Sequence, residues 1–154
     1  MAFRDGFLVE FDLEMANTRK LLECIPADKF DWQPHARSKP IGGLGNHIAM
    51  LPATAMILIN KMQGTRPSEA QSKAELLELF DASTARCRHA IVNASEEQLS
   101  RSLPVTPSRS RPLPEILRER IMNHLIHHRG QLVVYLRLLD VALPGMYGPS
   151  ADEN

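Results

Sequence analysis

The sequence has few cysteines, no net excess of positive or negative charge, and no long apolar run. Its two cysteines, Cys24 and Cys87, lie far apart and form no Cys-x-x-Cys motif. This pattern excludes a thiolate zinc site and favours two free, buried thiols. The 18 basic and 18 acidic side chains cancel, so the basic surface that nucleic-acid binding usually needs is missing. The charge balance also gives no support for a partnership with an anionic membrane.

Neither a secretion signal nor a membrane span is evident along the chain. Acidic residues interrupt the apolar pattern of residues 1–15, whereas a signal peptide carries an unbroken apolar stretch after basic residues. No segment approaches the ~18 consecutive apolar residues of a membrane-spanning helix. We therefore expect a cytoplasmic protein.

The chain of 154 residues is long enough for one domain with a single core, residues 1–154. Runs of alternating β-branched residues, repeats and heptad arrays are all lacking. Apolar residues instead recur at spacings of three, four and seven, as on one face of a helix. Four such segments are predicted: 3–24, about 40–63, 72–93 and about 113–139. Together they predict an all-α fold, an antiparallel four-helix bundle.

Several local signals refine this prediction. Pro52 falls within the second segment, and we expect it to bend that helix rather than end it, because the apolar stripe continues beyond it. Ser72 and Glu75 have the spacing of a capping box. Trp32 is expected to anchor the proline-rich loop 26–40 in the core. Residues 95–114 are predicted to form a long polar loop.

Three histidines lie within the stretch NHLIHHRGQ, residues 123–131. Positions four apart on a helix are ~40° apart in projection, so His124 and His128 share the apolar stripe of the last segment. His127 lies ~100° from His128, at the polar edge. Such a pair can chelate one metal ion, but two core histidines satisfied by hydrogen bonds would show the same pattern. His47 borders the stripe of the second segment and is the candidate third ligand; the other two histidines, at 35 and 89, are expected in solvent.

Four stretches of the chain resemble the DinB-like family of bacterial four-helix-bundle metalloproteins. They read SKPIGGLGNHIAMLP, NHLIHHRGQLVVYLR, LPGMYGPSADE and DWQPHARS. The resemblance as a whole extends over nearly the whole chain. The resemblance implies a divalent metal held by His47, His124 and His128, with one or more coordination positions open. Three neutral nitrogen ligands suit Zn²⁺ and Ni²⁺, which we expect ahead of Fe or Mn.

The resemblance implies a homodimer. It also implies one of two kinds of function found among members of the family. Some relatives are thiol-dependent transferases or isomerases that activate a small thiol such as bacillithiol or mycothiol at the metal. Others are known only as stress-related metal-binding proteins without an assigned reaction. Metal-dependent hydrolysis is a third hypothesis, with Glu10 or Glu14 as general base, although Glu14 also fits a solvated face. A small-molecule substrate that is anionic would find Arg101, Arg109 and Arg111 in the loop 95–114.

Expectations also follow for the neighbours of the histidines. His127 is assigned outside the ligand set. Arg129 is assigned to solvated surface in preference to the alternative, in which it orients water or a substrate anion. Gln131 is expected to orient water or a substrate anion. Tyr135 is assigned to core packing, and Tyr147 either folds back over the mouth of the bundle or packs.

Overall fold

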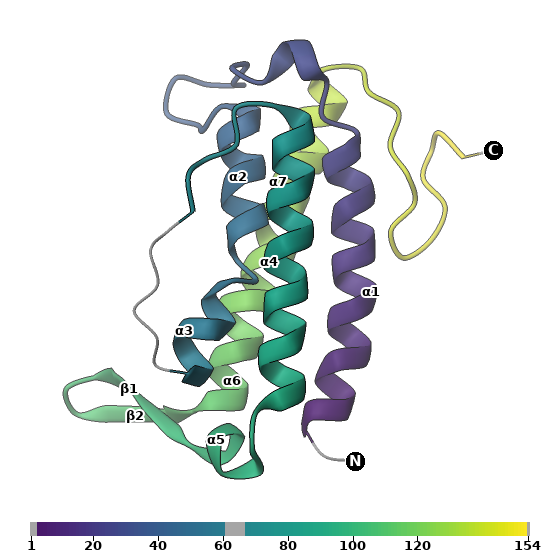
Figure 1. Cartoon of the computed structure of the whole chain (residues 1–154). Helices are drawn as coiled ribbons and strands as arrows, with labels where there is room; N and C mark the ends of the chain where they lie inside the picture. The colour runs from purple at the N-terminus through teal and green to yellow at the C-terminus, as the bar shows by residue number, and fades with distance from the viewer. Residues whose placement is uncertain (1–2, 61–66, 154) are drawn as a thin grey trace.

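The computed structural model describes residues 3–60 and 67–153 and shows a bundle of four long helical stretches (Figure 1). The first stretch is α1, Phe3–Glu23, and the third is α4, Lys73–Asn93. The second is divided into α2, Ile41–Met50, and α3, Thr54–Asn60. The fourth runs without interruption through α6, Leu113–Leu117, the π-helical turn η2, Arg118–Asn123, and α7, His124–Leu138. The predicted all-α bundle is confirmed.

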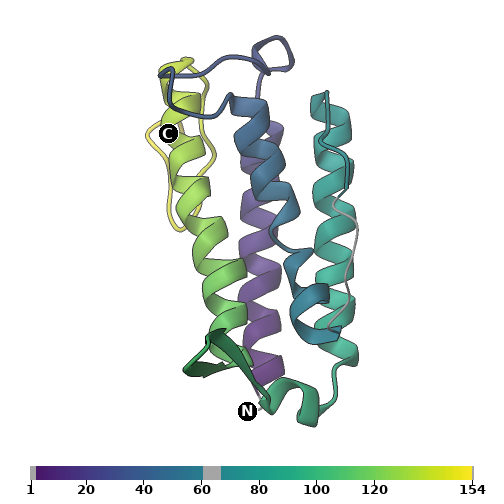
Figure 2. The ribbon, with the colours of Figure 1, turned by 90° about the vertical axis from the view of Figure 1, so that its left-hand side faces the viewer.

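The direction of the helices departs in one respect from a strictly antiparallel bundle. Stretches α1 and α6–α7 run one way, and α2–α3 and α4 run the other way (Figures 1 and 2). Neighbours α2 and α4 are therefore parallel. The 3₁₀ turn η1, Ala27–Lys29, lies in the connection between α1 and α2.

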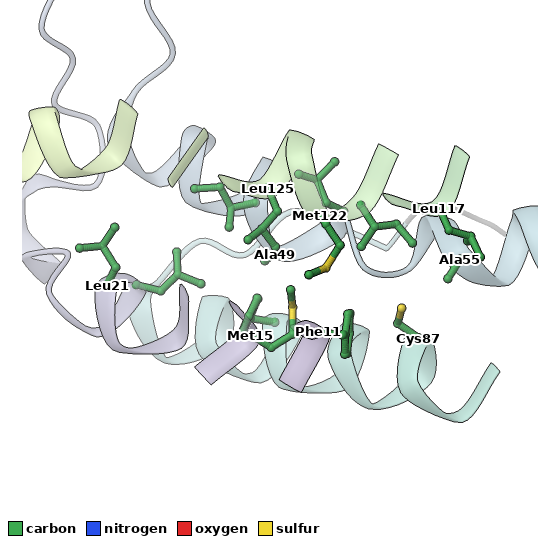
Figure 3. Packing of buried hydrophobic residues seen from close by; sticks show 14 of the residues in the cluster. Phe11, Met15, Leu21, Ala49, Ala55, Cys87, Leu117, Met122 and Leu125 are labelled. Atoms are coloured by element: carbon green, nitrogen blue, oxygen red, sulfur yellow. The ribbon is translucent and has the colours of Figure 1, made fainter. Parts of the chain in front are cut away.

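The core is filled by aliphatic, aromatic and methionine side chains from all four stretches. Phe11 and Met15 of α1 meet Met122 of η2 there, as Figure 3 shows. Cys87 of α4 is fully buried, and burial raises the pKa of its thiol to about 12. Both cysteines are free, as predicted, although Cys24 is only half-buried. A thiol in the position of Cys87 is a packing group rather than a nucleophile.

Pro52 interrupts the hydrogen bonding of the second stretch while leaving its path helical. Ala53 N donates to Met50 O at 3.2 Å and Thr54 N to Leu51 O at 3.1 Å, bonds one residue shorter than those of an α-helix. Ala53 N also donates to the hydroxyl of Ser83 on α4 at 3.0 Å. The change of direction is visible between α2 and α3 (Figure 1). The predicted end of this stretch, at Gln63-Gly64, lies outside the described residues.

The prediction of a polar loop over residues 95–114 is wrong, because most of this segment folds into a short helix and two short strands. Helix α5, Glu96–Ser100, starts at a capping box that Ser95 makes with Gln98. Strands β1, Ser102–Thr106, and β2, Arg109–Pro112, form an antiparallel hairpin at one end of the bundle (Figure 2). The two strands are short, largely exposed and contain prolines, so the alternation of Leu103 and Val105 in β1 is too brief to predict a strand.

The connection 26–40 is anchored where the sequence predicts. The backbone of Ile41 donates to Trp32 O at 2.8 Å and that of Gly42 to Phe30 O at 2.9 Å. A Cβ at position 42 would lie 2.2 Å from the Phe30 ring, so glycine permits this approach. Trp32 is half-buried and packs edge-on against Tyr135, with ring centroids 5.9 Å apart.

The segment Ile41–Asn60 is long and apolar enough to cross a membrane, which the sequence analysis did not anticipate. It is however 61% buried inside the bundle over its most apolar window. A core helix of a water-soluble bundle has the same composition, and its neighbours here are the other helices of the bundle.

Candidate metal centre

Three histidine rings from two neighbouring helices, α2 and α7, lie close together. His47 comes from α2, and His124 and His128 come from successive turns of α7. The Nε2 atoms of His47 and His124 lie 3.3 Å apart, and those of His124 and His128 lie 2.9 Å apart. The predicted trio is thus brought together. The remaining histidines at 35, 89 and 127 are exposed.

The spacing of these nitrogens fits a single metal ion. Ligands 2.0–2.1 Å from a metal are about 3.3 Å apart in a tetrahedron and about 2.9 Å apart at a right angle. The ligand atoms of the three histidines all lie within 4.8 Å of one another. In the part of the chain that the structure describes, no other group of three or more His, Cys, Asp or Glu residues has such a spacing. The three histidines are half-buried, so the group is partly accessible to solvent.

The helices that carry the histidines are fixed by nearby polar contacts. The side chain of Asn46, beside His47, donates to Ala70 O at 2.9 Å and accepts from Ala70 N at 2.8 Å. These two bonds tie α2 to the segment leading into α4. On the other helix, the backbone N–H of His124 bonds to Glu119 O, five residues back, at the end of the π-helical turn. Turns of this kind occur often beside functional residues, where they change the direction of a side chain.

The protonation of the site suits metal binding. Burial lowers the pKa of His124, and the positive charges of His128, His127 and Arg120 lower it further. A neutral imidazole offers a lone pair, whereas a protonated one does not.

A glutamine fixes the ring of His128 from outside. Nδ1 of His128 lies 2.7 Å from Oε1 of Gln131 and donates to it. In a neutral ring this bond makes Nε2, 2.9 Å from Nε2 of His124, the atom with the free lone pair. The amide nitrogen of Gln131 lies 3.2 Å from Nε2 of His127, to which it donates. His127 therefore supports the site through Gln131 and lies outside the ligand group, in agreement with the sequence-based assignment. Gln131 itself orients a ring nitrogen rather than a substrate.

We expect Gln131→Leu to weaken metal binding by about 10- to 100-fold, the usual effect of losing an acceptor behind a histidine ligand. Gln131→Glu is the matched control, because its carboxylate still accepts from Nδ1 of His128. Competition with a coloured chelator measures the two affinities. Equal losses in both variants would show that the hydrogen bond to His128 does not orient the ligand.

The sequence analysis placed Arg129 in solvent, and this is wrong. Arg129 is 3% exposed, and its Nη2 lies 2.6 Å from Oε2 of Glu14, which is 5% exposed. Nη1 of Arg129 donates to Glu14 O and to the hydroxyl of Thr18, both at 3.2 Å. Nothing in the sequence around Arg129 indicates that its side chain is buried. The position of Glu14 does indicate burial, because it lies between Phe11 and Thr18 on the buried face of α1.

Tyr147 connects the C-terminal segment to this ion pair. Its hydroxyl donates to Oε1 and Oε2 of Glu14, each at 2.8 Å, and contacts Nη2 of Arg129. Its ring remains largely exposed. Burial, followed by the hydrogen bond to Glu14, raises the pKa of Tyr147. Tyr147 thus packs over the pair rather than over the histidines.

The two carboxylates considered as a general base are bonded elsewhere. Glu14 accepts from Arg129 and Tyr147, and Glu10 is paired with Arg118. Neither belongs to the histidine group. The histidine group therefore offers three ring nitrogens and no carboxylate.

Comparison with known proteins agrees with this architecture. YjoA of Bacillus subtilis (strain 168) is 29% identical over 126 residues, 78% of this chain and 80% of YjoA. The crystal structure of YjoA has a TM-score of 0.72 at 23% identity, covering 92% of this chain and 96% of that one. A DinB-like protein of Bacillus cereus has a TM-score of 0.75 at 20% identity, covering 93% and 97%.

A more distant neighbour in structure is a mutant of a mycothiol-dependent maleylpyruvate isomerase. Its TM-score is 0.50 at 15% identity, and the match covers 93% of this chain but 65% of that one. This likeness concerns the fold. A sequence profile of the DinB family matches residues 5–154, nearly the full length. The chain belongs to the DinB family.

Proposed function

We propose that this protein binds one divalent transition metal through His47, His124 and His128 and uses it in a thiol-dependent S-transfer or isomerisation. The observation that carries the proposal is the close approach of three Nε2 atoms in a group that is partly accessible to solvent. Zn²⁺ and Ni²⁺ suit three imidazoles best, ahead of Fe and Mn.

The partial exposure of the histidine group favours catalysis over a purely structural role. A structural zinc site is usually closed by four protein ligands, whereas a catalytic one keeps a position for water or substrate. Among the described residues only three side chains form the group. A metal bound there would lower the pKa of a thiol that ligates it, which yields a nucleophile at neutral pH.

Two observations favour a thiol over water as the attacking group. Hydrolysis calls for a general base beside the metal, and the carboxylates of Glu10 and Glu14 are committed to arginines. A neighbour in fold is described as mycothiol-dependent, which supports a small thiol as co-substrate. A non-catalytic metal-binding protein is the alternative, and a fourth protein ligand on the metal would favour it.

The activity is tested with protein purified without chelator and analysed for metal by mass spectrometry. Bacillithiol, mycothiol and glutathione are then supplied in turn with a haloaromatic electrophile. We expect one thiol to react faster in the metal-loaded protein than in the metal-free protein. His47→Ala should reduce that rate to the metal-free level. Metal binding without acceleration by any thiol would instead support the non-catalytic alternative.

Three expectations from the sequence stay predictions. They are a homodimer, a cytoplasmic location, and the absence of nucleic-acid and membrane partners.

A further inference from the structure

Arg120 is a cation beside the histidine group that makes no ion pair in the described part of the structure. It lies in η2, four residues before His124 on the same continuous helix, and its side chain is exposed. The other arginines of this helical stretch, and Arg111 of the adjoining strand β2, are held by carboxylates. These pairs are Arg111 with Glu115 and Glu119, Arg118 with Glu10, Arg129 with Glu14, and Arg137 with Asp152. A guanidinium left unpaired at this place is available to a ligand.

Arg120 and His124 are four residues apart on one continuous helix, so their side chains leave the same side of it about one turn apart. The histidine group itself contains no carboxylate. Glu119 is adjacent to Arg120 in sequence, but it is bonded to Arg111, and Arg120 lowers its pKa only through space. A bound divalent cation would add its positive charge to that of Arg120, and the two together attract anions into the site.

The arginines that the sequence analysis considered for an anionic substrate lie elsewhere. Arg101 donates to Ile59 O and Gln98 O, so it serves the fold. Arg111 is paired with two glutamates, and Arg109 lies exposed on strand β2 of the hairpin. Arg120 was missed because an arginine in a polar stretch of helix carries no sequence signal of its neighbours.

We propose that Arg120 binds the carboxylate of an anionic thiol or electrophile whose reacting atom lies at the histidine-bound metal. This rests on the proposed function and names its substrate class. A guanidinium offers two parallel N–H donors to a carboxylate, so it holds such a ligand in a defined orientation as well as attracting it. Arg120 is thus a specificity residue for small carboxylate-bearing molecules.

The test uses binding rather than turnover. Protein loaded with Co²⁺ is titrated with 3-mercaptopropionate and with its neutral match 3-mercaptopropanol, and the sulfur-to-cobalt absorption band reports occupancy. We expect Arg120→Gln to weaken the binding of 3-mercaptopropionate by about fivefold, the upper range for a partly solvated ion pair. The binding of 3-mercaptopropanol should weaken by less than about twofold. In the unmodified protein, added salt should reduce the preference for the anion.

Two variants serve as controls. Arg120→Lys keeps the charge and should retain most of the preference for the carboxylate. Arg109→Gln removes an exposed arginine on the hairpin and should change neither affinity. An equal effect of Arg120→Gln on both thiols, or none on either, would overturn the assignment of Arg120 while leaving the metal–thiol site intact. Failure of the unmodified protein to bind cobalt or the neutral thiol would overturn the proposed function and this inference with it.

Discussion

His128→Ala is expected to abolish stoichiometric metal binding. His128 contributes one of three nitrogens, its Nε2 lies 2.9 Å from that of His124, and the described residues offer no carboxylate or thiolate to replace it. Metal that binds only the folded state stabilises it by about 2.7 kcal/mol at 100 times Kd. For a chain of this size that raises Tm by about 5–10 °C. The variant should show neither the bound metal by mass spectrometry nor the metal-dependent rise in Tm by calorimetry.

His127→Ala is the matched control, because it removes the adjacent histidine of the same helix. Its ring is exposed and reaches the site only through Gln131. The variant should keep one metal per chain and most of the rise in Tm. Full metal content in His128→Ala, or equal losses in the two variants, would refute the assignment of ligands.

The grouping of the three histidines was predictable in part, because helical periodicity and metal chelation require the same spacing. His124 and His128 are one turn apart on the inner side of α7, so a projection from sequence already places both nitrogens on one side. His47 could be proposed from its place beside the stripe of α2. Its approach to within 3.3 Å of His124 depends on how α2 packs against α7, which no local pattern encodes.

Other features depend on contacts between distant segments and escaped prediction for that reason. The β1–β2 hairpin is stabilised by pairing between two short strands, with Leu103 opposite Arg111. The role of Gln131 follows from which ring nitrogen of His128 it meets. Composition and periodicity describe the faces of helices, but they do not describe the partners of a polar side chain.

The buried pair of Glu14 and Arg129 has the largest predicted effect on stability. Their side chains are 7% and 4% exposed, and they join α1 to α7 one residue beyond a ligand histidine. Removing one partner of such a pair leaves an uncompensated charge in the core, which costs about 3–5 kcal/mol. Arg129→Met in the metal-free protein should therefore lower Tm by about 6–20 °C. Chemical denaturation followed by circular dichroism gives the free energy of unfolding directly.

A second substitution shows whether the loss of stability comes from the unpaired charge of Glu14 or from the lost packing of Arg129. In Glu14→Gln with Arg129→Met, the buried charge is gone and the amide oxygen of Gln can still accept from Tyr147. We expect the double variant to be more stable than Arg129→Met alone, although it carries one more change. Arg137→Met is the control on the same helix, since Arg137 pairs with Asp152 at the surface and such pairs contribute at most about 1 kcal/mol. If Arg129→Met were no more destabilising than Arg137→Met, the pair would not be an important link between α1 and α7. If the double variant were less stable than the single one, the loss would come from the missing side-chain contacts of Arg129 and not from the unpaired charge of Glu14.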